Sequence, residues 1–314
     1  MKAIFNKVLE KRGISLFIVL FLIASFSSDT FFSKSNLSNV LLQVSTDGIV
    51  AIGMTYVILS GGIDLSVGNL IALVSVITIL VQASHGTIAG IVLALIAALI
   101  IGLINGLLVA KVGVSPFVTT LGIMILVKGI ALAISDSKSH SGTDPAFASF
   151  ADKQFLGLPY ASIIFLLLVL IFDFVLKKTA FGREFYAVGG NREASWLAGL
   201  NVDKYLIFAY MFCSFITAVG GVIVTSRINT GSPIIAADTS TSVISAVLLG
   251  GTSMAGGMGS VSNTLWGVLI IGILKNMMNL MGIGGYYQTI LLGLLLIISV
   301  FWDRTNFHFM QSNK

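Results

Sequence analysis

The polar side chains best placed to do chemistry follow a pair of glycines inside a long apolar stretch. Asp64 and Ser66 come directly after Gly61 and Gly62 in the block VILSGGIDLSVG (57–68). Glycine permits backbone dihedrals that stop a helix, and Asp or Ser at such a place can cap the next helix. A carboxylate at membrane depth is costly unless it faces a cavity or a partner. We therefore expect Asp64 to cap a helix, to line the path of a polar solute, or to do both.

A second block, FGREFYAVGGNREASWLAGLNV (181–202), is polar and basic, and it predicts one short helix. Gly189 and Gly190 should break the preceding structure, and Asn191 is a good N-cap for this short helix. Glu193 complements the positive end of the helix dipole, and Gly199 suits the residue after the C-cap, where a positive φ is needed. A helix of about two turns is not stable alone, so its Trp196 needs a surface. That surface is either the lipid headgroups or a groove on a cytoplasmic partner.

A third block, LLGGTSMAGGMGSV (248–261), has too many glycines for a continuous helix. It lacks the Lys-Ser/Thr ending of a phosphate-binding loop, and no other stretch supplies that pattern, so the chain does not hydrolyse ATP by this route. Nearby, Lys275, Asn276 and Asn279 form a polar stripe on an apolar helix, which either lines a translocation path or bonds neighbouring helices. Asp173 lies one turn from Lys177, which favours an ion pair.

The composition places these blocks in a membrane protein. Of 314 residues, 56% are hydrophobic and only 10% are charged, with a mean hydropathy of +1.00, whereas soluble domains carry about a quarter charged residues. We predict an all-α membrane protein, residues 1–314 forming one domain with broken or re-entrant segments. A span needs about 20 apolar residues, and ten such runs lie near 14–28, 40–60, 69–84, 87–110, 115–135, 159–176, 205–226, 240–253, 261–281 and 286–302.

The distribution of Lys and Arg predicts how these spans are oriented. Cytoplasmic segments carry an excess of Lys and Arg. Threading ten spans from a cytoplasmic N-terminus to a cytoplasmic C-terminus gives a cytoplasmic loop at 177–204 and an external loop at 136–158. The cytoplasmic segments then hold most of the basic residues, and the external ones hold Lys34, Lys138, Lys153 and Arg227. The net charge of +5 thus reflects membrane topology and does not indicate a nucleic-acid partner. With a single cysteine, Cys213, no multi-cysteine metal site is expected, and no cofactor is predicted.

Several blocks in order resemble the permease subunits of bacterial sugar ABC importers of the ribose, xylose and galactoside type. The resemblance runs over most of residues 31–302 through FFSKSNLSNVL (31–41), GIVAIGMTYVILSGGIDLSVG (48–68), GLINGLLVAKVGVSPFVTTLG (102–122), TAFGREFYAVGGNREASWLAGLNV (179–202), residues 248–274 and NLMGIGGYYQ (279–288). The combination of GGIDLSVG with YAVGGN is specific. The chain departs from the family pattern at Ser240 and Ser242, where relatives usually carry an acidic pair, and at Asn263, Lys275 and Met277.

The resemblance implies a permease in the bacterial cytoplasmic membrane that carries a ribose-like monosaccharide or related polyol and is not itself an enzyme. It implies a second permease subunit, cytoplasmic ATPase subunits and an external sugar-binding protein as partners, besides membrane lipid. We expect the ATPases to dock on the loop that carries Gly190, Asn191, Arg192, Glu193, Trp196 and Gly199. Candidates for the translocation path are Gly62, Asp64, Ser66, Asn105, Asn276 and Gln288.

Two other functions stay open at the level of sequence. An ion-coupled secondary transporter would need buried carboxylates as a relay, and only Asp47, Asp64 and Asp173 qualify. A branched-chain amino-acid ABC permease shares the general architecture, although the GGIDLSVG block favours sugar. In the sugar-importer interpretation, Lys34, Lys138, Lys153 and Arg227 pair with acidic residues of the binding protein.

Overall fold

The computed structural model describes residues 12–312, and it is mostly helical. Within these residues every predicted apolar run coincides with a helix. These helices are α2 (Arg12–Ser27), α3 (Lys34–Leu59), α4 (Val67–His85), α5 (Thr87–Leu107) with its π-helical extension η1 (Leu108–Val112), α6 (Pro116–Ile134), α8 (Tyr160–Lys178), α11 (Val202–Ile228), α12 (Thr239–Leu249), α13 (Val261–Leu280) and α14 (Gly285–Ser312).

Not all of these helices have the length of a membrane span. Among the described residues, seven are long and apolar enough to cross a bilayer: α3, α4, α5 with η1, α6, α8, α11 and α13. The apolar parts of α2, α12 and α14 are shorter. An all-α membrane fold is therefore confirmed, while a count of ten spans stays a prediction. The basic residues Lys2, Lys7, Lys11 and Lys314 lie outside the described residues.

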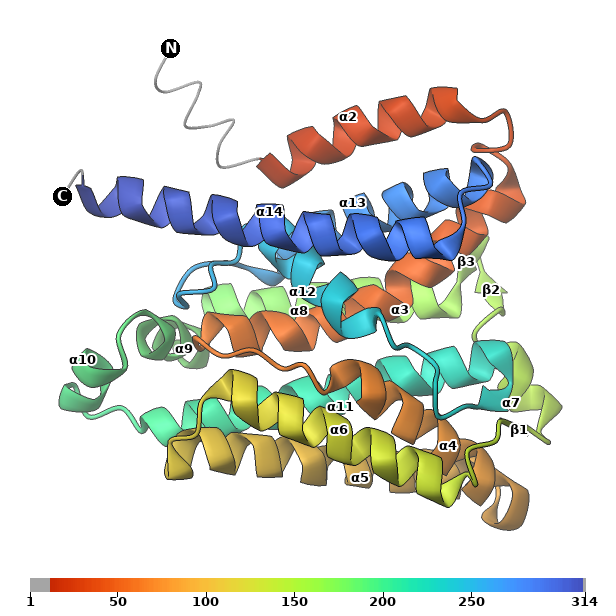
Figure 1. Cartoon of the computed structure of the whole chain (residues 1–314), viewed down its shortest axis with the longest axis horizontal. Helices are drawn as coiled ribbons and strands as arrows, with labels where there is room; N and C mark the ends of the chain where they lie inside the picture. Colours follow the sequence, from red (N-terminus) through yellow and green to blue (C-terminus); the bar gives the residue numbers. More distant parts are fainter. Residues whose placement is uncertain (1–11, 313–314) are drawn as a thin grey trace.

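Helices α3 and α11 form the centre of the bundle, with α5 and α6 on one side and α13, α14 and α2 on the other (Figure 1). The most apolar window of α3 is 83% buried, whereas those of α5, α6 and α8 are 28% buried. A Cβ built on Gly53 of α3 would lie 2.8 Å from the Cα of Cys213 in α11. Small residues allow such close backbone approach, which strengthens helix packing where lipid offers no hydrophobic driving force.

The two ends of the bundle carry different structures. One end, here called the strand end, holds α7 (Pro145–Phe150) and two short antiparallel ladders, which pair β1 (His140–Ser141) with β4 (Thr230–Gly231) and β2 (Gln154–Phe155) with β3 (Leu158–Pro159). Helices α9 (Ala180–Gly190) and α10 (Arg192–Leu197) project from the opposite end (Figure 1). The predicted external loop 136–158 and the predicted cytoplasmic loop 177–204 thus lie at opposite ends.

Polar contacts join neighbouring segments within each of these ends. The ion pair of Lys111 and Asp203, 2.7 Å long, joins two segments predicted to be cytoplasmic. The side chain of Gln82 accepts from the Thr143 N–H across 2.9 Å, and this contact joins the end of the predicted span 69–84 to the predicted external loop. Each contact thus joins segments that the predicted topology puts near the same side, while the orientation of the termini and the number of spans stay predictions.

Candidate functional site

The three glycine-rich blocks, far apart in the sequence, meet at the end that carries α9 and α10. The Gly257 N–H donates to the Leu59 carbonyl oxygen across 2.9 Å. A Cβ built on Gly256 would lie 2.5 Å from the Gly189 carbonyl oxygen, and one built on Gly257 would lie 2.6 Å from the Cα of Gly190. Main chains approach this closely only where side chains are absent. We call residues 59–62, 189–190 and 256–257 the glycine junction.

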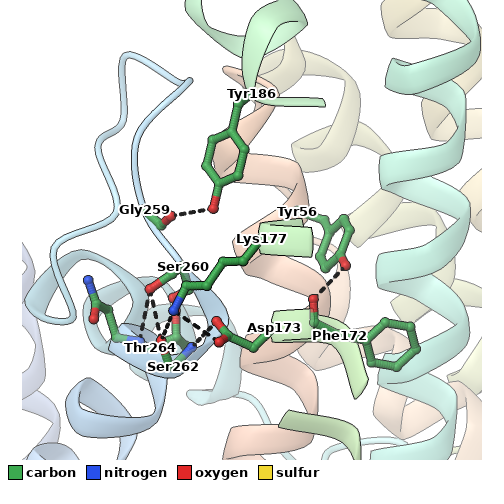
Figure 2. Close-up of polar contacts among 10 residues, drawn as sticks. Tyr56, Phe172, Asp173, Lys177, Tyr186, Gly259, Ser260, Ser262 and Thr264 are labelled. Carbon is green, nitrogen blue, oxygen red and sulfur yellow. Dashed lines mark hydrogen bonds and ion pairs between the residues drawn. The ribbon is translucent and has the colours of Figure 1, made fainter. Parts of the chain in front are cut away.

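The loop that carries Gly256 and Gly257 is also fastened by α8 and α9 (Figure 2). The Tyr186 hydroxyl donates to the Gly259 carbonyl across 2.7 Å. The Asp173 carboxylate accepts from the Ser262 N–H across 2.9 Å and pairs with Lys177 at 2.9 Å. Ser262 lies in the first turn of α13, where free N–H groups favour a negative partner. The predicted pairing of Asp173 with Lys177 is confirmed, and it also anchors the start of α13.

Burial, with the Asp173 carboxylate as a second cause, raises the pKa of Tyr186. Its hydroxyl is therefore protonated at neutral pH and acts as the donor to Gly259. Sequence patterns gave no indication of this tie, because Tyr186 and Gly259 are brought together only by the fold.

Helix α10 has the local structure that the sequence predicts. The Asn191 side chain accepts from the Ala194 N–H across 2.9 Å, as an N-cap does. At the other end Gly199 has φ +84°, and the Leu200 N–H bonds back to the Ser195 carbonyl at 3.0 Å. Trp196 is 68% exposed, and its neighbour Leu197 is exposed as well. Glu193 lies in the first turn. The exposed Trp196 and Leu197 give the last turn of the helix an apolar tip.

The prediction that Gly189 and Gly190 break the structure before α10 is wrong. Both residues belong to the last turn of α9, and the break falls at Asn191, which is extended with φ −158°. Gly189 is needed for packing, because a Cβ on it would overlap the Leu59 carbonyl oxygen. Helix α9 itself was missed, and its buried Phe185, whose ring lies 5.2 Å from that of Tyr56, fixes it to the bundle.

Arg192 lies differently from the role predicted for it. Its guanidinium donates to the Ser60 carbonyl across 2.9 Å and reaches the Gly61 carbonyl at 3.5 Å. The side chain thus turns back from α10 onto the end of α3, within the glycine junction. Any contact it makes to another subunit shares a group that is already bonded inside this chain.

Asp64, Ser66 and Asn105 form one buried network beyond the junction, and all three are 0% exposed. Asp64 Oδ1 accepts from the Ser66 N–H at 2.9 Å and from the Ser66 hydroxyl at 2.5 Å. The Asn105 amide donates to the Ser66 hydroxyl oxygen across 3.2 Å. Asp64 Oδ2 and Asn105 Oδ1 have no hydrogen-bond partner among the described residues.

This network corrects two expectations. Neither Asp64 nor Ser66 caps α4: Ser66 occupies the N-cap position without a side-chain cap bond, and Asp64 forms a local turn with the residue two further on. The expected cavity is not open to solvent in this conformation, since the carboxylate is enclosed by protein. Gly62 is likewise buried, and a Cβ on it would lie 2.5 Å from the Tyr210 hydroxyl oxygen.

Asn276 and Gln288 are not brought to this network. Asn276 pairs reciprocally with Asn36 in the first turn of α3, with the shorter bond at 2.7 Å. Gln288 donates to Asn279 across 2.6 Å. The junction lies at the last turn of α3, whereas Asn276 of α13 is bonded to the first turn of that helix, and Gln288 of α14 is bonded to Asn279 one turn further along α13. Of the two interpretations of the polar stripe, the structure supports bonding between helices at Asn276.

Lys275 forms a charge pair inside the bundle. Its Nζ lies 3.2 Å from Asp47 Oδ2 and 2.9 Å from the Ser242 hydroxyl oxygen, so the contact ties α13 to α3 and α12. Lys275 is 16% exposed and Asp47 is 23% exposed. Two of the residues that depart from the family pattern, Ser242 and Lys275, therefore contact each other. The pairing of Lys275 with Asp47 offsets the cost of a charge at this depth.

The four basic residues predicted to meet a binding protein, Lys34, Lys138, Lys153 and Arg227, are all exposed. They lie in or beside segments of the strand end. Across the part of the chain that the structure describes, no three His, Cys, Asp or Glu residues are grouped to hold a metal ion.

Comparison with known families shows which family the chain belongs to. Residues 36–300 match the family described as the permease component of the branched-chain amino acid transport system. The chain belongs to this family. The permease is 39% identical over 305 residues to the ribose import permease protein RbsC of Bacillus subtilis (strain 168), covering 96% of this chain and 94% of the relative.

Two further relatives agree. RbsC of Escherichia coli (strain K12) is 36% identical over 301 residues, covering 94% of each chain. The L-arabinose transport system permease protein AraH of Escherichia coli (strain K12) is 35% identical over 302 residues, covering 96% of the permease and 92% of the relative. No solved structure matches the chain. The permease is thus a multi-pass protein of the bacterial cytoplasmic membrane and a transport component without catalytic activity of its own.

Proposed function

We propose that this permease forms the membrane pathway of an ATP-driven importer for a monosaccharide of the pentose type, such as ribose or a related polyol. The observation that carries the proposal is the near full-length similarity to permeases named for ribose and L-arabinose. The family description mentions branched-chain amino acids, but these relatives are named for sugars.

Energy comes from separate ATPase subunits in this proposal. The sequence has no phosphate-binding loop. The exposed tip of α10, formed by Trp196 and Leu197, is an apolar surface on a helix too short to be stable without a support. We place the ATPases on α10, with Gly190, Asn191, Glu193 and Gly199 shaping that surface. The junction end then faces the cytoplasm, in keeping with the excess of basic residues there.

We place the external binding protein at the strand end. An external sugar-binding protein delivers the solute, and acidic residues on it pair with Lys34, Lys138, Lys153 and Arg227. Residues 1–314 act as one membrane domain, with α2, α12 and α14 completing ten spans, and a second permease subunit shares the pathway. Gly62, Asp64, Ser66 and Asn105 become part of that pathway when the enclosed network opens, because the first three lie at the break between two spans and Asn105 of α5 is bonded to it.

An ion-coupled mechanism has little support in the arrangement of carboxylates. Asp47 is paired with Lys275, and Asp173 is paired with Lys177. Asp64 is buried and hydrogen-bonded to Ser66, and no other carboxylate is bonded to it among the described residues. A proton or ion relay needs such groups in a connected series.

The test is solute uptake by proteoliposomes that contain the permease with its ATPase and binding protein. Ribose, arabinose, xylose, galactose and leucine are offered with ATP inside the vesicles, and an ionophore is added in parallel. We expect pentose uptake that requires ATP and the binding protein and is insensitive to the ionophore. Uptake by the permease without ATPase, driven by an ion gradient, contradicts the proposal, and preference for leucine contradicts its substrate class.

A further inference from the structure

The end of α3 depends on two other segments for its hydrogen bonds. The last carbonyl groups of any helix lack partners within that helix. Here the Leu59 carbonyl accepts from the Gly257 N–H, and the Ser60 carbonyl accepts from the Arg192 guanidinium. A cation at this position also faces the negative end of the helix dipole. The C-terminus of α3 is therefore capped by the loop before α13 and by the first residue of α10.

Helix α10 is joined to the end of α3 by the Arg192 side chain and, through α9, by close packing of the main chain. Arg192 begins α10, and Asn191 links it directly to Gly190 at the end of α9. Gly189 in turn packs against the Leu59 carbonyl without any side chain between the two main chains. A movement of α10 relative to α3 must therefore break the Arg192 bond or carry the end of α3 with it.

The segment after α3 carries the buried network. Residues 60–66 are not helical, and they hold Asp64 and Ser66 against Asn105 of α5. Non-helical backbone at membrane depth has few restoring hydrogen bonds, so it is the part of the span that yields when its ends move. The path from the exposed tip of α10 to the enclosed carboxylate thus runs through one guanidinium and one turn.

We propose that Arg192 is a positioning residue that couples α10 to the 60–66 break, so that displacement of α10 opens the Asp64–Ser66–Asn105 network. The inference rests on the proposed docking of an ATPase at α10 and adds the route by which that docking acts. It assigns Arg192 to a contact inside the permease, where the sequence favoured a contact to the partner.

The experiment compares Arg192→Gln, Arg192→Lys and the control Lys178→Gln in the assembled importer. Lys178 is exposed on the same side of the chain at the end of α8, so its replacement removes an equal charge. Three quantities are measured: ATPase retained per permease, ATP hydrolysed, and solute moved per ATP. We expect Arg192→Gln to retain ATPase and hydrolysis while solute moved per ATP falls about tenfold, the size of effect that loss of a charge-assisted hydrogen bond produces.

Arg192→Lys should recover part of that loss, because an ammonium group can reach one carbonyl, and Lys178→Gln should match the wild type. A normal ratio in Arg192→Gln overturns the inference. Loss of ATPase from that variant overturns it as well, because Arg192 would then act in docking. If the wild-type permease itself retains no ATPase, the proposed function fails instead.

A second measurement needs no ATPase. Hydrogen exchange of the amides in 60–66 is recorded for the purified full-length permease. We expect faster exchange in Arg192→Gln than in the wild type or Lys178→Gln, with unchanged exchange in the interior of α11. Identical exchange in all three proteins shows that Arg192 does not position the break.

Discussion

Replacement of Gly189 by alanine sets helix propensity against packing. At a helical position, alanine is normally more stable than glycine by about 0.5–1 kcal/mol. Here the added Cβ would overlap the Leu59 carbonyl oxygen and lie 2.8 Å from the Gly257 nitrogen. These two atoms are hydrogen-bonded to each other at 2.9 Å. The substitution must therefore separate them, or move α9 away from α3.

The expected cost has two parts. Overpacking of a tight contact costs about 1–3 kcal/mol, and an unpaired buried polar group costs about 1–3 kcal/mol. After the gain in helix propensity, the net destabilisation is about 3 kcal/mol, which lowers Tm by roughly 5–10 °C in a protein of this size. The matched control is Gly190→Ala, since Gly190 is exposed and a Cβ there meets nothing within 4 Å. The control should melt at or slightly above the wild-type temperature.

The chain provides its own reporter for this assay. Cys213 is the only cysteine in the sequence and is fully buried, so a thiol-reactive dye labels the detergent-solubilised permease only as it unfolds. If Gly189→Ala and Gly190→Ala melt together, the main chains at the junction can separate freely, and the reasoning from close approach is refuted.

Three other predictions concern docking, the break and the charge pair. Trp196→Asp should abolish uptake and ATPase retention while the permease stays in the membrane, because a charge enters the docking surface; normal copurification and uptake contradict this. Gly62→Val should abolish uptake, because the Cβ of the introduced valine would lie 2.5 Å from the Tyr210 hydroxyl oxygen. Unchanged uptake would mean that the turn tolerates a side chain at this position. Lys275→Met should destabilise the permease by up to about 3 kcal/mol, because it leaves Asp47 unpaired. The double variant Lys275→Met with Asp47→Asn should recover most of that loss in the same dye assay. Equal melting of the single and double variants would show that the two residues are not coupled.

The long apolar helices of this permease were predictable because each depends mainly on its own sequence, whereas α9 was not predicted. A run of about 20 apolar residues forms a helix in lipid wherever it occurs. The local structure of α10 was predictable for a similar reason: Asn191 and Gly199 are caps that act within a few residues.

The features that could not be predicted depend on which residues the fold brings together. Gly189 looks like a helix breaker in isolation, and only the position of Leu59 shows that it serves close packing. Asp64 looks like a cap, yet its partner is Ser66, which in turn accepts from Asn105 of α5. The direction of the Arg192 side chain depends on the free carbonyls at the end of α3, which no local pattern reveals.

The charge pair of Asp47 and Lys275 has a consequence for biogenesis. The two residues are separated by 228 positions in the chain, so Asp47 emerges from the ribosome long before Lys275 has been translated. Until then its carboxylate lacks its Lys275 countercharge, and an unpaired carboxylate at membrane depth costs about 3 kcal/mol. We therefore expect a permease truncated before α13 to hold α3 in the membrane less stably than the full-length chain does.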